Sequence, residues 1–336
     1  MSRIRMSQSM IKDYTDYRNK SLCGLYFDAR WISRTHSSEP SEAMMMGRWF
    51  EYLALGPYHG TAGSEYGMPS GDLPGGFKAA GRKAVAQWDE LLSNPWANDP
   101  IKDEDVEAHW TAKYVNLWYQ AKHLRSTFEA YGIEVIDVQK KIEKDHGKYD
   151  RVMVWDVLAI CHKIPDPSYT RKPLILAGAK EDGDDLEISS RPYLEPHLAI
   201  IDVKATGLID DKWKPYGWAQ EGLEYRDKLM IQAVDYMDQV RDIKGEDYPS
   251  AFYFFVHSNT NSKDRKIYQI KPSQEALDQH REKVEYMVTD LEFEIQTGFI
   301  PYPSLERCQE CPLLTTCEKA VYHPQIRTVY LTGSGS

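Results

Sequence analysis

The stretch LAIIDVKATG, residues 198–207, decides how this chain folds and where its chemistry lies. Residues 198–201 are apolar, as expected for a strand that enters the core of a sheet. Asp202 and Lys204 follow at positions i and i+2, so both side chains point to the same face of that strand. A carboxylate can hold a hard divalent cation, and a lysine beside it can activate a water or stabilise charge on a phosphate. Alone, the pattern also fits a surface ion pair at a strand end, so further acids are needed.

Other polar residues at ordered spacings extend this candidate site. HGKYDRVMVW places Asp150 at the start of an expected strand, and Gly147 three residues earlier permits a tight approach. MGRWFEYLALG places Glu51 on an expected helix, four residues after a glycine and on the same side. Gln232 and Tyr236 in QAVDYM share one face of a helix because they are four residues apart. The motif order along the chain is G-x3-E, G-x2-D, D-x-K, Q-x3-Y.

The composition sets the class of protein. The 336 residues are 42% apolar and 27% charged, which is enough for a large buried core in one elaborated domain or two small ones. The sequence has no run of about 18 apolar residues and no apolar segment typical of a secretory signal at its start. We therefore expect a cytoplasmic protein that does not contact the membrane.

The charge pattern bears on nucleic-acid binding. A net charge of −10 argues against a protein coated with basic residues, although it leaves room for a local groove. Residues 1–35 carry seven Lys/Arg against three acids, with aromatic residues interleaved, including Tyr14, Tyr17, Tyr26 and Trp31. Such a segment suits attraction to a DNA backbone and base stacking, but a solvated face with aromatic core packing explains it as well.

The order of expected elements indicates an α/β fold. We expect helices at 7–32, 42–55, 221–242 and 273–298, a Gly- and Pro-rich loop at 56–76, and a largely helical segment at 77–131 that stops at Gly132. β-branched and aromatic runs predict strands at 133–139, 151–160, 173–178, 197–205, 251–258 and 266–272. Helices would therefore flank a sheet.

Three of the five cysteines lie in CQECPLLTTC, residues 308–317, spaced as C-x2-C-x5-C. In a cytoplasmic protein, closely spaced thiols indicate metal binding or redox chemistry rather than a disulfide framework. Three thiolates leave a tetrahedral metal site incomplete.

The motif order resembles that of the PD-(D/E)XK nucleases, specifically the RecB-like exonuclease branch. That branch includes AddB-type enzymes, CRISPR-associated RecB-like exonucleases and phage exonucleases. The resemblance runs from SQSMIKDY to Cys317, with 56–131 matching less well. It implies a central mixed β-sheet flanked by helices, a restriction-endonuclease-like core. The implied regions are an N-terminal helical region 1–55, a loop and helical insertion 56–131, a nuclease core 132–272, a C-terminal helix with the cysteines 273–325, and a tail 326–336.

The resemblance also assigns roles to the polar residues. Asp150 matches the first acid, and Asp202 and Lys204 match the second acid and the lysine. In the family, the carbonyl of the residue between acid and lysine, here Val203, also faces the metal. Asp156 competes with Asp150 for the place of the first acid, but it lacks a nearby glycine, so we assign that place to Asp150.

Two further motifs complete the assignment. Glu51 stands where many RecB-like members have histidine and where phage exonucleases can have an acid, so its role as a metal ligand departs from the common pattern. Gln232 and Tyr236 match the Q-x3-Y helix, which would contact DNA or brace the lysine.

In iron–sulfur members of this branch, one cysteine near the N-terminus joins the C-terminal group. Here Cys23 in KSLCGLYF would join Cys308, Cys311 and Cys317, and Cys161 would be left over. Four thiolates suit a [4Fe–4S] cluster, although they also suit structural zinc. Such a site would close a loop of about 285 residues and staple the N-terminal region to the C-terminal segment.

The resemblance implies a deoxyribonuclease, an exonuclease dependent on Mg²⁺ or Mn²⁺, that acts on DNA with a free end in recombination, repair or phage DNA processing. The sequence has no phosphate-binding loop, so a helicase, like a single-strand annealing protein or recombination complex, would be a separate partner. Two alternatives stay open. One is a non-cleaving DNA-end binder in a recombination or CRISPR adaptation complex, and the other is a redox sensor built from the clustered thiols.

Overall fold

The computed structural model describes residues 3–37, 42–61, 112–166, 192–207, 209, 218, 227–244, 250–261 and 264–320. The chain forms two compact units, one of Met1–Gln8 with Pro40–Lys283 and the other of Ser9–Glu39 with Val284–Ser336. The predicted region 1–55 is thus divided between the units, and the expected strand at 173–178 lies outside the described residues. No helix in the described ranges is both long and apolar enough to cross a bilayer.

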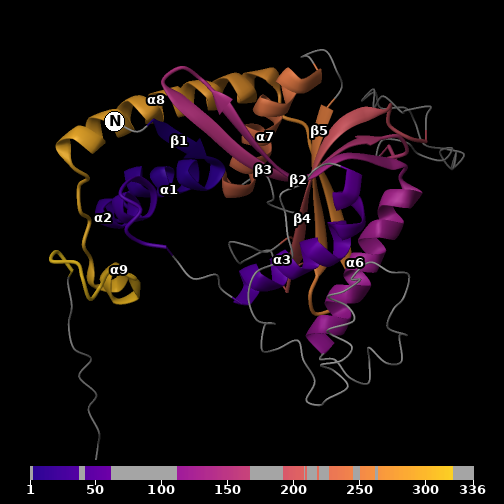
Figure 1. Cartoon of the computed structure of the whole chain (residues 1–336), viewed down its shortest axis with the longest axis horizontal. Helices are drawn as coiled ribbons and strands as arrows, with labels where there is room; N and C mark the ends of the chain where they lie inside the picture. The colour runs from indigo at the N-terminus through magenta and orange to yellow at the C-terminus, as the bar shows by residue number, and fades with distance from the viewer. Residues whose placement is uncertain are drawn as a thin grey trace, which may run out of the picture. The chain divides into compact units, whose positions relative to one another are not determined.

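The first unit is built on a mixed sheet of six described strands (Figure 1). They are β1 (Ile4–Ser7), β2 (Ile133–Asp145), β3 (Tyr149–Cys161), β4 (His197–Thr206), β5 (Ser250–Ser258) and β6 (Arg265–Ile270). The order is β1-β3-β4-β5-β6, with β2 paired to β3. The pairs β1–β3 and β4–β5 are parallel, whereas β2–β3, β3–β4 and β5–β6 are antiparallel. The predicted α/β class with a central mixed sheet is confirmed.

Helices cover both faces of this sheet, which explains why the central strands are apolar almost throughout. On one face lie α3 (Glu42–Leu55) and α6 (Ala112–Ala130), whose buried residues include Phe50 and Phe128 and pack with Val203 and Phe255. On the other lie α7 (Asp227–Lys244) and residues 274–283 of α8 (Gln274–Thr297), and the core there includes Met237 and Phe254. Full burial of each such side chain contributes roughly 1.5–3 kcal/mol.

Helix α6 shows how the sequence encodes one of these covers. Leu117, Ala121, Leu124 and Phe128 recur at helical spacing and are all buried. The helix ends at Ala130, and Gly132 follows with φ of 58°. This left-handed residue is the predicted C-terminal stop, because glycine adopts that conformation without steric strain.

The hairpin of β2 and β3 is longer than predicted. Strand β2 continues past 139 to Asp145 through a charged stretch in which exposed and half-buried residues alternate from 141 onward, a pattern without a strong apolar signal. The ladder shifts by one residue between Val135 and Asp137, which marks a β-bulge. Strand β1 was also not predicted, because its four residues precede a helix directly.

The second unit contains α1 (Gln8–Arg18), α2 (Gly24–Phe27), a π-helical turn (Asp28–Ile32), residues 284–297 of α8, and α9 (Leu305–Glu310). The predicted continuous helix at 7–32 is therefore broken. Ser21 and Leu22 donate their backbone N–H groups back to the Asp16 carbonyl, and Lys20 has a left-handed φ of 59°, so α1 ends in a capping turn.

Aromatic side chains form the interior of this second unit. Tyr17 and Phe27 stack with ring centroids 5.9 Å apart, and Phe299 and Tyr302 pack against Tyr17 at 5.9 Å and 5.7 Å. The Tyr17 hydroxyl donates to Glu294 at 3.0 Å. Burial of these rings holds the N-terminal segment to the chain after α8 within this unit.

Candidate functional site

The register of β3 against β4 decides which acid meets Asp202. Val157 pairs with Ile201 and Leu158 with Ile200. One step further along the same antiparallel ladder, Asp156 comes opposite Asp202. Asp156 Oδ2 also accepts a hydrogen bond of 2.8 Å from the Val203 N–H. The acid that joins the D-x-K motif in space is therefore Asp156.

Asp202 lies at the centre of the group. Its side chain is 4% exposed, and Gln232 of α7 donates Nε2 to its Oδ1 at 2.5 Å. Lys204 Nζ forms an ion pair with the Oδ2 atom of Asp202 at 2.6 Å. Apart from this ion pair, the buried Oδ2 atom accepts no hydrogen bond from the described residues. Lys204 itself is 34% exposed and can reach a bound substrate.

Glu51 of α3 completes the group through an amide that the sequence did not single out. Gln139 of β2 places its Nε2 3.1 Å from Glu51 Oε2 and 3.4 Å from Asp156 Oδ1. Glu51, Asp156, Asp202 and Lys204 therefore converge from one helix and two strands. Of the predicted residues, the structure brings Glu51, Asp202, Lys204 and Gln232 together.

Asp150 is not part of this group, which corrects the placement expected from sequence. It lies toward the other end of β3, where Arg3 Nε is 3.3 Å from its Oδ1 and where it pairs with Arg5 in the ladder. The glycine that favoured Asp150 has a different use. Gly147 has φ of 81° and forms the tight turn of the β2–β3 hairpin.

The two residues of the Q-x3-Y helix act on different partners. Gln232 holds Asp202, as described above, whereas the Tyr236 hydroxyl donates to the Val154 carbonyl at 2.9 Å. Tyr236 is buried, and burial together with the nearby Asp202 raises its pKa above the ordinary range. Tyr236 therefore braces β3 as a neutral donor.

The charges of the group are strongly coupled. Burial raises the pKa of Glu51 to about 7. The positive charge of Lys204 opposes this shift, and the negative charge of Asp202 adds to it. Burial and the charges of Glu51 and Asp202 raise the pKa of Asp156 well above its usual value. Burial opposes the charge of Lys204, but the carboxylates of Asp202 and Asp156 outweigh it and raise its pKa. Lys204 pairs with Asp202, and the raised pKa values show that a negative charge on Glu51 and Asp156 is unfavourable without further positive charge, which a divalent cation would supply.

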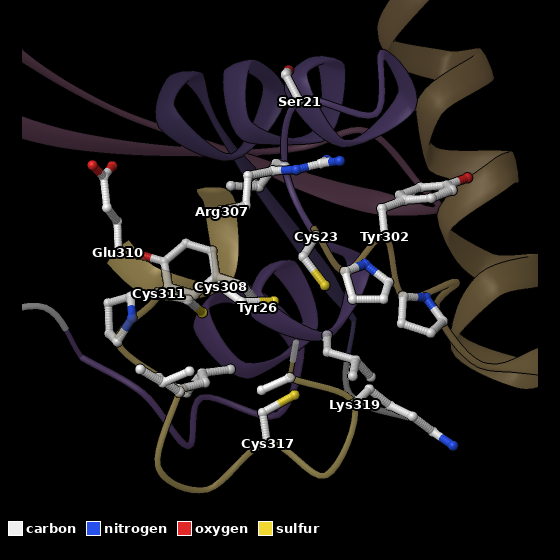
Figure 2. A pocket seen from close by; sticks show the side chains of 18 residues that line it. Ser21, Cys23, Tyr26, Tyr302, Arg307, Cys308, Glu310, Cys311, Cys317 and Lys319 are labelled. Atoms are coloured by element: carbon white, nitrogen blue, oxygen red, sulfur yellow. The ribbon is translucent and has the colours of Figure 1, made fainter. Parts of the chain in front are cut away.

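The thiols form a second group, in the second unit (Figure 2). Cys23, Cys308, Cys311 and Cys317 all line one cavity of about 360 Å³. Burial raises the pKa of Cys311, and the three other thiols raise it further. Cys161 lies elsewhere, 1% exposed in the core under α3 and α6, where burial raises its pKa to about 12.

Local structure places three of these thiols. The Ser304 side chain accepts from Arg307 N and caps α9, which carries Cys308 in its last turn and Cys311 at its C-cap. Cys317 follows in a turn in which its N–H donates to the Leu313 carbonyl at 2.8 Å, and this turn positions the third thiol. Cys23 comes from the N-cap position of α2.

Within the described ranges, no three His, Cys, Asp or Glu side chains stand as close together as the ligands of a bound ion. The donor chemistry of each group nevertheless matches a class of metal. Clustered carboxylates oriented by amide groups suit Mg²⁺ or Mn²⁺, and four thiols around one cavity suit an iron–sulfur cluster or zinc.

Two aromatic residues of the basic N-terminal segment, Tyr14 and Tyr17, are not available for stacking. Tyr14 and Tyr17 are each 1% exposed and belong to the interior of the second unit. Arg18 pairs with Glu294 at 3.2 Å, and Arg30 pairs with Asp13 at 2.9 Å. For these residues the core-packing interpretation is correct.

No protein-family model matches this chain, and no curated protein matches it significantly. Among solved structures, the chain is similar to a protein from Eubacterium rectale described as a "putative exonuclease", with 15% identity and a TM-score of 0.46, over 96% of this chain and 91% of that one. It is also similar to the protein SSO0001, with 14% identity and a TM-score of 0.26, over 71% of this chain and 82% of that one. Neither likeness is close enough to carry an argument.

Proposed function

We propose that this chain is a metal-dependent deoxyribonuclease that removes nucleotides from a free DNA end. The observation that carries the proposal is the meeting of Glu51, Asp156 and Asp202 with Lys204, in which Gln139 bridges Glu51 to Asp156 and Lys204 pairs with Asp202. The motif order of the PD-(D/E)XK nucleases supports it, with Asp156 in place of Asp150. A protein that only held DNA ends would have no use for this combination of groups.

The three carboxylates and the Val203 carbonyl would hold Mg²⁺ or Mn²⁺, which polarises the scissile phosphate and lowers the pKa of a water. Lys204, held in its charged form by the acids, would position that water or stabilise the charge that develops on the phosphate. Gln232 and the Val203 N–H fix the orientations of Asp202 and Asp156, so these acids need little rearrangement.

We further propose that Cys23, Cys308, Cys311 and Cys317 hold a [4Fe–4S] cluster with a structural role, with zinc as the alternative. Their placement around one cavity supports this proposal. The cluster would tie the segment before α2 to α9 and the turn after it, all within the second unit.

The proposed partner is DNA with a free end. A helicase, a single-strand annealing protein or a recombination complex would act as a separate chain, in recombination, repair, phage DNA processing or CRISPR adaptation. The acid group argues against a redox sensor, for which the thiols alone would suffice.

Digestion of linear DNA labelled separately at each end, with a closed circular DNA of the same sequence as the control, tests the nuclease proposal. With Mg²⁺ or Mn²⁺ we expect labelled nucleotides from the linear DNA, no loss of the circle, and no reaction in EDTA. Release in EDTA, or no release with either metal from folded protein, would overturn it. Cleavage of the circle would overturn the exonuclease assignment.

A further inference from the structure

Gln139 has a backbone conformation that its own strand does not favour. It lies in β2 between Val138 and Lys140, which pair with Val157 and Trp155 of β3, yet its φ is +49°. Left-handed backbone is disfavoured for residues with a Cβ atom, and glycine or asparagine usually occupies it. A glutamine held there indicates that its side chain, rather than its backbone preference, accounts for its presence.

The side chain of Gln139 is directed at the acids. It is 8% exposed, and its Nε2 lies 3.1 Å from Glu51 Oε2 and 3.4 Å from Asp156 Oδ1. Glu51 comes from α3 and Asp156 from β3, so a single amide group spans two elements that are far apart in sequence.

The chemistry of an amide suits this place. The NH₂ group has two donors and no charge, so it can satisfy both acids together without neutralising either. A lysine or arginine in its place would form ion pairs with the acids and compete with a bound cation. An amide therefore orients the two carboxylates and preserves their affinity for metal.

We propose that Gln139 is a positioning residue that holds Glu51 and Asp156 facing one divalent-cation site. The inference rests on the proposed function and extends it to a residue outside the nuclease motifs.

The test measures Mn²⁺ binding and thermal unfolding separately, in Gln139→Gly and Gln139→Asn. Both replacements accept a left-handed backbone, and neither side chain reaches the acids as glutamine does. We expect Mn²⁺ affinity without DNA, measured from free Mn²⁺ by electron paramagnetic resonance, to fall at least about tenfold. The metal-free melting temperature should change little, because relief of the backbone strain offsets the loss of the hydrogen bonds from the amide.

Gln120→Asn is the matched control. Gln120 is also a buried amide, 1% exposed, but it bonds to His257 and to the Asn261 carbonyl rather than to the acids. We expect this control to lower the melting temperature and leave Mn²⁺ affinity unchanged.

Unchanged Mn²⁺ affinity in both Gln139 variants, or a fall matched by a lower melting temperature, would overturn the inference and leave the nuclease proposal standing. Wild-type protein that binds Mn²⁺ but releases no nucleotides would remove the nuclease proposal alone. Wild-type protein that binds no Mn²⁺ would overturn both.

Discussion

The acid group and the thiol group are built in opposite ways. Glu51, Asp156 and Asp202 come from three elements spread over about 150 residues, and side-chain amides and a backbone N–H hold their oxygens. In the thiol group, Cys308, Cys311 and Cys317 fall within ten residues, and helix capping and backbone turns place them. One site depends on the register of a sheet, and the other mostly on local chain geometry.

This difference predicts different responses to metal. The acids are oriented before a cation arrives, so binding should change the first unit little. A metal must displace protons in both groups, since the pKa values of Glu51, Asp156 and Cys311 are all raised. Few side-chain contacts orient the thiols, however, so there its binding energy becomes folding energy. Loss of metal should therefore inactivate the first unit but unfold the second.

Lys204→Ala should give the largest effect on the acid group. The variant loses a charge used at the transition state but keeps the three carboxylates, so nucleotide release should fall at least about 100-fold while Mn²⁺ binding persists. Lys141→Ala, which removes an exposed lysine of the same unit, is the control and should cleave like wild type. Near-wild-type cleavage by Lys204→Ala would show that the chemistry lies elsewhere.

The thiol group responds through folding. Cys23→Ser and Cys311→Ser should each lose bound iron and the brown absorption of the cluster, because a four-ligand site with one ligand missing is poorly held. Cys161→Ser should keep both, since Cys161 lies in the core under α3 and α6. Iron analysis of protein purified without oxygen provides the measurement. Full iron content in Cys23→Ser would refute the four-ligand assignment, and zinc in place of iron would refute only the cluster's identity.

The Q-x3-Y helix offers a smaller, graded test of the acid group. Gln232→Leu removes the donor to Asp202, so Mn²⁺ affinity should fall about tenfold. Tyr236→Phe removes the hydrogen bond to the Val154 carbonyl but keeps the Gln232 donor to Asp202, so it should lower the free energy of unfolding by about 1 kcal/mol and leave Mn²⁺ affinity unchanged. Equal losses of Mn²⁺ affinity in the two variants would contradict the assignment of Gln232 to the acid group and of Tyr236 to the support of β3.

A separate test, on stability rather than on either metal site, is a pH dependence carried by the first unit. Burial lowers the pKa of His257 to about 3, whereas in the unfolded chain it is about 6.5. Below about pH 6.5 the unfolded chain binds a proton that the folded chain does not. The free energy of unfolding therefore decreases as the pH is lowered, by up to about 1.4 kcal/mol per pH unit. Urea titrations at several pH values give the slope of the free energy of unfolding against pH. In His257→Asn this slope should be smaller by the contribution of one proton, and an unchanged slope would contradict the assignment.

Sequence alone could predict the elements that have strong local signals. The strand predicted at 197–205, the α8 helix and the stop at Gly132 follow from apolar periodicity and glycine. The pairing of Asp202 with Lys204 also follows, because two residues apart on a strand is a fixed geometry.

The first acid could not be predicted in the same way. Asp150 and Asp156 lie on one strand, and only the register with β4 distinguishes them. Gly147 gave a misleading local signal, because its positive φ serves the hairpin turn. Gln139 had no signal beyond a polar residue at the end of an apolar run, since its partners depend on how α3 docks on the sheet.

The most direct test of the acid group compares Asp156→Asn with Asp150→Asn in nucleotide release from linear DNA with Mg²⁺. Both changes remove one negative charge from the same strand with almost no change of shape. The structure predicts a loss of at least about 100-fold for Asp156→Asn and near-wild-type release for Asp150→Asn, whose partner is Arg3 rather than Asp202. The reverse result, with Asp150→Asn inactive and Asp156→Asn active, would contradict the site as it is built here.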